Sequence, residues 1–204
     1  EDAGYEVLVF HATGTGGRTM EALIESGMID GVLDLTTTEW ADELVGGTLT
    51  AGPTRMDAMT RANVPAVVAP GCVDMVNFGE RQSVPAAFEG RNFYLHNPQV
   101  TLMRTTPDES RAIGKMLATK ANANTAPTAI YLPCGGVSVI GREGRPFHDA
   151  KADAALFQAI HDNARCEVVD FDHDINHPEF ATACANKLIQ MLGGKPSQPN
   201  QPKS

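Results

Sequence analysis

Short apolar runs alternate with longer stretches of helical periodicity along most of this chain. The runs are four to seven residues long and rich in β-branched and aromatic residues, which is typical of strands. They predict strands at residues 6–12, 31–36, 66–69, 92–96, 128–132 and 167–171. Strands that alternate with helices predict an α/β protein, in which helices cover both faces of a mostly parallel sheet.

Apolar residues three and four positions apart predict the helices. Near the start, Met20, Leu23 and Ile24 share one helical face. The same spacing recurs near the end in Phe180, Cys184, Leu188, Met191 and Leu192. Another helix begins at Thr106, because Thr106 and Glu109 form a capping box and Pro107 occupies the first helical position.

The length and composition favour one globular domain. A chain of 204 residues with 42% hydrophobic content can bury one sizeable core. We therefore predict a single domain over residues 1–192. Residues 193–204 are rich in glycine, proline and glutamine and have nothing to bury, so we expect a disordered tail.

Charge and cysteine spacing exclude several classes of function. The 16 basic and 25 acidic residues give a formal charge of -9, which argues against direct binding of nucleic acid. We find no apolar stretch long enough for a membrane helix. The four cysteines form no CxxC pair, so we expect reduced thiols in a cytoplasmic protein.

The stretch VLVFHATGTGGRTMEAL, residues 7–23, has the order of an anion site: strand, glycine turn, helix start. Backbone N–H groups in the first turn of a helix lack internal partners, and glycine lets a phosphate approach them. We predict that this loop binds phosphate. Its candidate binding residues are Thr13, Gly14, Thr15, Gly16, Gly17 and Arg18.

The loop matches known nucleotide fingerprints only in part. Gly14 and Gly16 begin a GxGxxG motif, but Thr19 stands at the third glycine position. Asp34 lies where an acid that binds ribose is expected. In the alternative interpretation, the glycines form only a sharp turn and Asp34 faces solvent.

Other polar clusters follow predicted strands, and the carboxyl ends of parallel strands form the ligand crevice of such sheets. The further binding candidates are Thr36, Thr37, Thr38, Glu39, His96, Asn97, Gly135 and Gly136, and the candidate acids or bases are His11, Glu39, Asp42 and His96. The cluster that follows the strand at 66–69 ends at Cys72. Each cluster has a plain alternative, since threonines cap helices and a single histidine is often only hydrogen-bonded.

An acidic, histidine-rich stretch precedes the last helix. Asp170, His173 and His177 are the metal candidates within it, and Asp172 and Asp174 are further possible ligands. No recognised ligand spacing is present. A solvated loop in which Asn176 or His177 caps the last helix is the alternative.

The segments EVLVFHATGTGGRTMEALI, GVLDLTTTEWADELVGG, APGCVDMVNFG and HNPQVTLMRTTPDE resemble an uncharacterised protein family of bacteria and plants. This family shares the ATP-binding domain of the tomato mosaic virus resistance protein. The resemblance continues through GVSVIGREGRPFHD and HDINHPEFA. It implies a Rossmann-like three-layer sandwich that forms the second half of a module about twice as long.

The same resemblance implies nucleotide binding, and it fits the abrupt start of the chain. The family more usually reads His-Ile-Asn-Asp where this chain has Asp-Ile-Asn-His at residues 174–177. The two possible ligands are exchanged, so a ligand geometry fixed by the family sequence does not carry over to this chain. We expect a small-molecule binding module for ATP or another phosphate-bearing ligand. The alternatives are an enzyme acting on a phosphorylated or carboxylated metabolite and a protein-interaction domain. The expected partners are the missing N-terminal half or a second copy of the chain.

Overall fold

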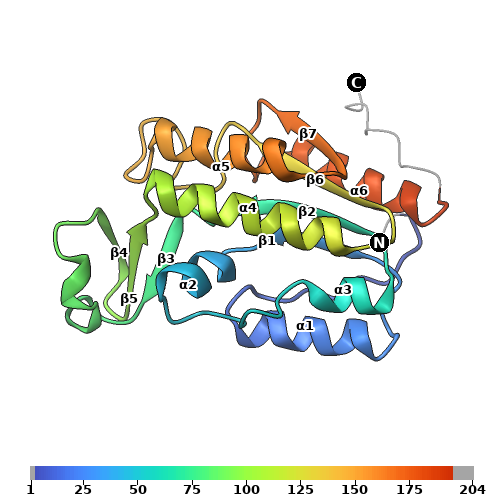
Figure 1. Cartoon of the computed structure of the whole chain (residues 1–204), viewed down its shortest axis with the longest axis horizontal. Helices are drawn as coiled ribbons and strands as arrows, with labels where there is room; N and C mark the ends of the chain where they lie inside the picture. Colours follow the sequence, from blue (N-terminus) through green and yellow to red (C-terminus); the bar gives the residue numbers. More distant parts are fainter. Residues whose placement is uncertain (1–2, 195–204) are drawn as a thin grey trace, which may run out of the picture.

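A computed structural model describes residues 3–194 and contains a four-stranded parallel sheet. Its strands are β1 (Val32–Thr36), β2 (Ala66–Gly71), β6 (Thr128–Pro133) and β7 (Glu167–Phe171), in the order β1-β2-β6-β7 (Figure 1). All three neighbouring pairs are parallel. The predicted α/β class is confirmed, and four of the six predicted strands are the strands of this sheet.

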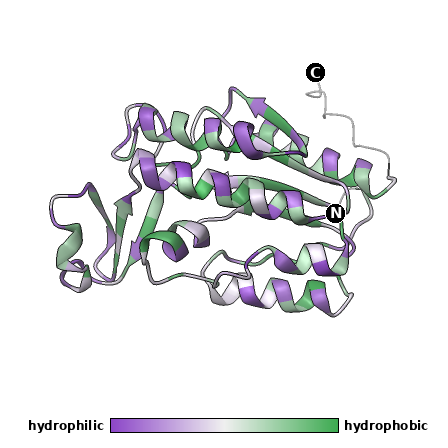
Figure 2. Ribbon diagram, viewed as in Figure 1, coloured by the Kyte–Doolittle hydropathy of each residue, from purple (hydrophilic) through white to green (hydrophobic). Residues whose placement is uncertain are grey.

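Helices cover the two faces of this sheet as the alternation predicts. α4 (Pro107–Ala123) and α5 (Ala150–Asn163) pack together on one face, and α6 (Pro178–Met191) packs against β1 and β2 on the other. Alternate residues of β2 therefore enter different cores: Ala66 and Val68 join the first, while Val67 and Ala69 pack with α6. The result is a Rossmann-like three-layer sandwich, and hydrophobic residues alternate with hydrophilic ones along its helices (Figure 2).

Three shorter helices lie beside β1. They are α1 (Thr15–Glu25), α2 (Glu39–Val45) and α3 (Asp57–Ala62), and α1 packs against α3. The predicted helix around Met20 is therefore confirmed as α1. None of the helices among residues 3–194 is both long and apolar enough to cross a membrane.

The predicted helix starts near residues 106 and 178 are also confirmed. Thr106 and Glu109 form the reciprocal capping box that opens α4. His177 caps α6, since the N–H of Glu179 donates to its Nδ1 at 3.3 Å. The predicted tail, apart from Gly193 and Gly194, lies outside the described residues.

The strand predicted at 92–96 exists but belongs to a different sheet. It is β4 (Phe93–Asn97), and it pairs antiparallel with β5 (Val100–Arg104), which also pairs with β3 (Met75–Phe78). Only Pro98 and Gln99 separate β4 from β5, and so short a connection permits only an antiparallel pair. This second sheet projects from one end of the sandwich together with two 3-10 turns, η1 (Arg81–Ser83) and η2 (Ala86–Phe88).

The strand predicted at 6–12 is wrong, because these residues form no ladder in the structure. Val7, Leu8 and Val9 are instead among the exposed large hydrophobic residues. β1 consequently remains at the edge of the four-stranded sheet. An apolar run becomes a strand only when a neighbouring strand takes up its backbone hydrogen bonds, and the run itself does not encode that pairing.

Candidate functional site

The candidate site is the carboxyl edge of the parallel sheet, where the loops that follow neighbouring strands are bonded to one another. The N–H of Thr37, after β1, donates to the carbonyl of Gly71 at 3.1 Å. The N–H of Cys72, after β2, donates to the carbonyl of Val137 at 2.8 Å. The N–H of Gly135, after β6, donates to a carbonyl in the loop after β7 at 3.1 Å. The loops after all four strands therefore form one continuous row.

The glycine loop adjoins this row through Glu39. Gly14 precedes α1 with φ 76° and ψ -60°, and the N–H of Thr15 donates to the carbonyl of Thr13, so the loop makes a γ-turn. A Cβ at Gly14 would lie 2.5 Å from the carbonyl oxygen of Thr50. Glycine is therefore required at this position for the turn itself.

Glu39 occupies the inner side of this turn. The N–H of Gly14 donates to Oε1 of Glu39 at 2.8 Å, and Nε of Arg55 donates to Oε2 at 2.6 Å. Glu39 is 1% exposed. These contacts commit the Gly14 N–H and the Glu39 carboxylate to internal bonds, which favours the structural interpretation of both groups.

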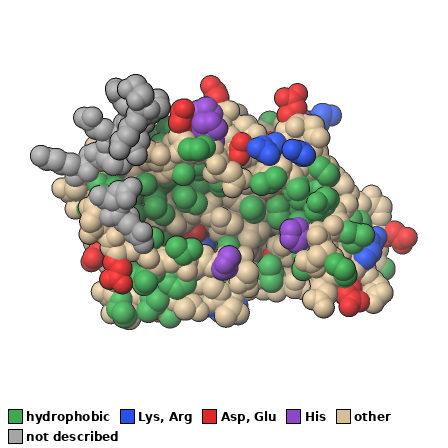
Figure 3. Space-filling view, turned by 180° about the vertical axis from the view of Figure 1, so that it is seen from behind, with side chains coloured by type: hydrophobic (Ala, Val, Ile, Leu, Met, Phe, Trp, Pro, Cys, Tyr) green, Lys and Arg blue, Asp and Glu red, His purple; other side chains and the backbone are tan. Residues whose placement is uncertain are grey.

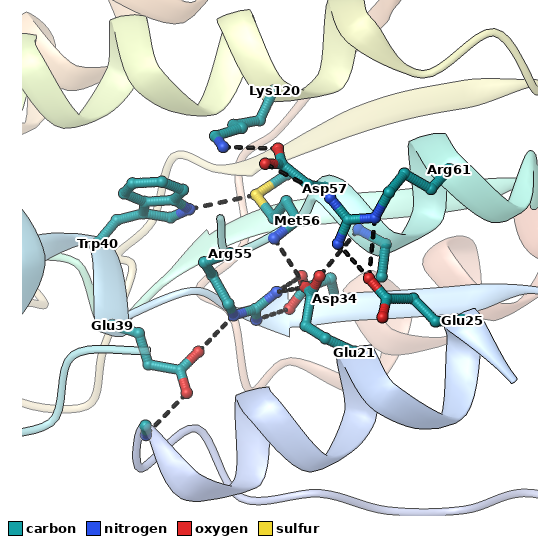
Figure 4. A network of polar contacts seen from close by, with 12 residues as sticks. Glu21, Glu25, Asp34, Glu39, Trp40, Arg55, Met56, Asp57, Arg61 and Lys120 are labelled. Carbon is teal, nitrogen blue, oxygen red and sulfur yellow. Dashed lines mark hydrogen bonds and ion pairs between the residues drawn. The ribbon is translucent and has the colours of Figure 1, made fainter. Parts of the chain in front are cut away.

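Arg55 lies at the centre of a buried network of ion pairs, which Figure 4 shows in close-up. Its guanidinium donates to both oxygens of Asp34, at 2.6 and 2.7 Å, and to Glu21 at 3.2 Å. Glu21 also accepts the N–H groups of Met56 and Ala58, so it caps α3. Burial lowers the pKa of Arg55, but the neighbouring Asp34 and Glu39 outweigh this and raise it overall.

Asp34 is thus neither solvent-facing nor free. It is 4% exposed and both carboxylate oxygens are bonded to Arg55. The alternative interpretation, in which it faces loop solvent, is wrong, because Arg55 compensates the cost of burying its charge.

Exposed donors remain on the outer side of the glycine loop. His11, Thr13, Thr15 and Arg18 are exposed. The guanidinium of Arg18 donates to the carbonyl of Thr50 at 3.0 Å and to Oγ1 of Thr15 at 3.2 Å. These two bonds use some of the five N–H donors of the Arg18 guanidinium and hold its remaining donors over the loop.

The remaining glycines of the loop pack tightly. A Cβ at Gly16 would overlap the carbonyl of His11, and one at Gly17 would overlap the carboxylate of Glu39. Substitution at either position would displace backbone or a buried charge.

The threonine cluster after β1 divides between surface and interior. Thr36 is exposed, whereas Thr37 and Thr38 are buried. Oγ1 of Thr37 donates to the carbonyl of Ala69 at 3.0 Å, and Oγ1 of Thr38 accepts from Asn77 at 3.5 Å. Thr37 and Thr38 therefore join parts of the fold.

Asp42, a candidate acid, is also internal. It accepts the backbone N–H of Asn77 at 2.6 Å and its side-chain amide at 2.8 Å, which ties α2 to β3. Burial raises the pKa of Asp42 to about 6. With an exposed fraction of 1%, this carboxyl group serves the contact between α2 and the second sheet.

His96 and Asn97 do not belong to the row of loops. They lie exposed on β4, in the projecting antiparallel sheet. Their inclusion with the strand-end clusters of the parallel sheet is wrong, because β4 is a strand of the antiparallel sheet.

Gly135 and Gly136 do lie in the row. A Cβ at Gly135 would come within 2.7 Å of the backbone of the β7 loop, and the carbonyl of Gly136 accepts the N–H of Ile175 at 3.0 Å. Cys134 beside them is exposed, and partial burial raises its thiol pKa above the ordinary value. A raised pKa leaves it a protonated, weak nucleophile.

The metal candidates divide into two groups. Asp170 lies 2.9 Å from Nε2 of His161 on α5. His173 and His177 instead lie together with Glu179, which the sequence prediction omitted. The His-x3-His spacing, with a glutamate two residues further on, was the available signal.

The prediction also missed Asp74, three residues beyond the end of β2. It is 1% exposed; Oγ of Ser138 donates to its Oδ2 at 2.6 Å, and Oδ1 receives no hydrogen bond from another described residue. Burial raises the pKa of Asp74 to about 6, against the lowering effects of Ser138 and Arg104. The predicted cluster ended at Cys72, and a carboxylate directly after a buried strand was the signal available.

Comparison with known proteins decides the family. Residues 1–192 match the C-terminal domain of the uncharacterised protein family UPF0261. The chain belongs to this family. The predicted resemblance is therefore confirmed.

The relatives are longer proteins. The chain is 52% identical to a UPF0261 protein of Clostridium tetani over 195 residues, which are 94% of the chain and 48% of the relative. It is 47% identical over 187 residues to a UPF0261 protein of Rhizobium meliloti, covering 89% of the chain and 46% of the relative. It is 41% identical over 192 residues to the tomato ToMV resistance protein Tm-1(GCR237), covering 92% of the chain and 26% of that protein. The chain spans about half the length of the bacterial relatives.

Proposed function

We propose that this UPF0261 domain binds a phosphate-bearing small molecule, with a nucleotide such as ATP as the expected class. The observation that supports the proposal is the continuous row of loops at the carboxyl edge of the parallel sheet, with the start of α1 beside it. Open parallel sheets hold their ligands at this edge.

The phosphate position in this proposal lies on the outer side of the glycine loop. Glu39 takes the Gly14 N–H on the inner side, and Arg55 offsets the charge of Glu39. The exposed hydroxyls of Thr13 and Thr15 and the fixed guanidinium of Arg18 are the donors that remain. Arginine held in this way suits phosphate oxygens because its donors are already oriented.

We further propose that the ligand is closed in by the remaining half of the longer family members. The chain carries exposed apolar side chains that such a cover would bury, among them Val7, Leu8 and Val9 in the N-terminal segment and Leu33 on the edge strand β1. Seen from behind, the molecule shows hydrophobic side chains gathered near its centre (Figure 3). A second copy of the chain is the alternative cover for this surface.

Calorimetric titration with ATP, ADP and pyrophosphate, each with Mg²⁺, tests the function. We expect Arg18→Ala to weaken binding at least about tenfold, since a charge-assisted hydrogen bond contributes about 1.5–3 kcal/mol. Arg111→Ala is the matched control, because Arg111 is an exposed arginine on α4 that pairs with the exposed Asp108. Gly16 is unsuitable as a test position, because any side chain there displaces the His11 backbone.

The titration also tests the cover. The full-length Clostridium tetani relative should bind the same ligand more tightly than this domain, while light scattering on the domain reports any association between copies. Equal affinities in Arg18→Ala and Arg111→Ala would refute the proposed phosphate position. Absence of binding to both the domain and the full-length relative would refute the function.

A further inference from the structure

Two histidines and a glutamate converge where the loop after β7 enters α6. Candidate ligand atoms of His173, His177 and Glu179 all lie within 4.8 Å of one another. The two imidazole rings stack with centroids 3.8 Å apart and planes 5° apart. Nε2 of His173 is 3.1 Å from Oε2 of Glu179. We propose that these three side chains form a Zn²⁺ site.

The donor set suits zinc. Neutral imidazole nitrogens and a carboxylate oxygen are ordinary zinc ligands, and three protein ligands leave one tetrahedral position open for water or an anionic oxygen. The side chain of His173 is 35% exposed and that of Glu179 is 75% exposed, so an ion can enter from solution. The fold fixes the spacing, because Pro178 sets the first turn of α6 between the second histidine and the glutamate.

Zinc binding requires a small rearrangement of side chains. Tetrahedral ligands about 2.1 Å from the metal lie about 3.4 Å apart, so the three groups must close inward. Both rings must also turn out of the stack, because imidazole lone pairs lie in the ring plane. His177 then gives up the 3.3 Å bond that caps α6, whichever of its nitrogens binds the ion.

The electrostatic surroundings partly oppose and partly favour the ion. The amino end of a helix carries partial positive charge, which disfavours a cation. Glu179 supplies a direct negative charge, and Asp172 is an exposed carboxylate in the same loop. Asp174 is paired with Arg142 at 3.2 Å and adds less. The site therefore depends on Glu179 as well as on the histidines.

Competition between the protein and a chromophoric zinc chelator, without nucleotide, measures the site independently of the proposed function. We expect one Zn²⁺ per chain in the wild type. His173→Ala and Glu179→Gln should each lower the affinity at least about tenfold, since even supporting groups around a metal contribute that much. Co²⁺ in place of Zn²⁺ should give visible bands typical of tetrahedral coordination.

The controls separate this site from other ligands and from misfolding. His161→Ala removes another partly exposed histidine that pairs with a carboxylate, and Cys134→Ser removes an exposed thiol in the adjacent loop; both should leave zinc affinity unchanged. His177→Asn keeps a side chain able to cap the helix while removing the imidazole, and circular dichroism verifies the fold. A wild type that binds no stoichiometric zinc would overturn the proposal. Equal affinity in His173→Ala, or loss of binding in Cys134→Ser, would overturn it too.

Discussion

Two groups of buried carboxylates lie near the same end of the parallel sheet and differ in what surrounds them. Asp34 and Glu39 share the guanidinium of Arg55, and every bond between them is 2.7 Å or shorter. Asp74 has the hydroxyl of Ser138 on one oxygen and no bond from another described residue on the second. The first group is compensated by a directly bonded positive charge, and Asp74 by one hydroxyl dipole and the charge of Arg104, which forms its own ion pair with Asp153.

The difference shows how burial is tolerated in each place. A buried charge costs several kcal/mol unless a partner compensates it, and otherwise the group takes up a proton. Arg55 provides such a partner, and the neighbouring carboxylates raise its own pKa. Asp74 follows the other route, since its pKa rises to about 6.

The largest expected effect comes from removing Arg55. Arg55→Met leaves Asp34 and Glu39 buried without a charged partner, and we expect the unfolding free energy to fall by about 3–5 kcal/mol. Urea unfolding at pH 7 measures this, with Arg111→Met, an exposed arginine, as the control that should change stability by less than about 0.5 kcal/mol. A loss below about 1 kcal/mol would show that Arg55 does not compensate the buried charges of Asp34 and Glu39.

A smaller, pH-dependent effect is expected at Asp74. A carboxyl group with a raised folded-state pKa loses stability as pH rises, and here the loss runs from about pH 4 to just above pH 6. Asp74→Asn removes this loss, so its stability relative to the wild type should improve by about 3 kcal/mol between pH 4 and pH 7.5. Unfolding curves at both pH values give the difference, and a pH-independent difference would contradict the raised pKa.

The smallest effect is expected at Glu21. The side chain of Glu21 is 13% exposed, and its distance of 3.2 Å to the guanidinium is the longest of the three ion pairs of Arg55. Glu21→Gln keeps an acceptor for one of the two N–H groups at the start of α3, loses the other bond and relieves repulsion from Asp34, so stability at pH 7 should fall by about 1 kcal/mol. A loss as large as that of Arg55→Met would show that all three carboxylates, and not two, are essential to the network.

Local signals in the sequence predicted much of the fold. The capping box at Thr106 involves only residues three positions apart. The strands at 66–69 and 128–132 are continuous apolar runs, because helices cover both faces of the sheet there. The composition of the stretch before the last helix likewise pointed to His173 and His177 as possible ligands, although it showed no recognised ligand spacing. Each of these features is encoded within a few residues.

Features that depend on distant residues were not predicted. Nothing near Asp34 or Glu39 indicates that Arg55 reaches both, 21 and 16 residues away. Segment 6–12 has a strand composition but no bonded neighbour. Edge pairing and buried ion pairs are set by tertiary structure, so they override local propensity.

The position of the Arg55 network along the chain has a consequence for folding. Arg55 and Asp34 are 21 residues apart, whereas Ala66 of β2 pairs with Thr128 of β6, 62 positions away. Closing the shorter loop costs about 1 kcal/mol less chain entropy. A nascent chain that ends after α3 contains Arg55 and the three carboxylates bonded to it, but neither β2 nor β6. Those charges are still hydrated at that stage, and a hydrated ion pair contributes little. The ion pairs around Arg55 therefore reach their full contribution only when the rest of the domain has buried them.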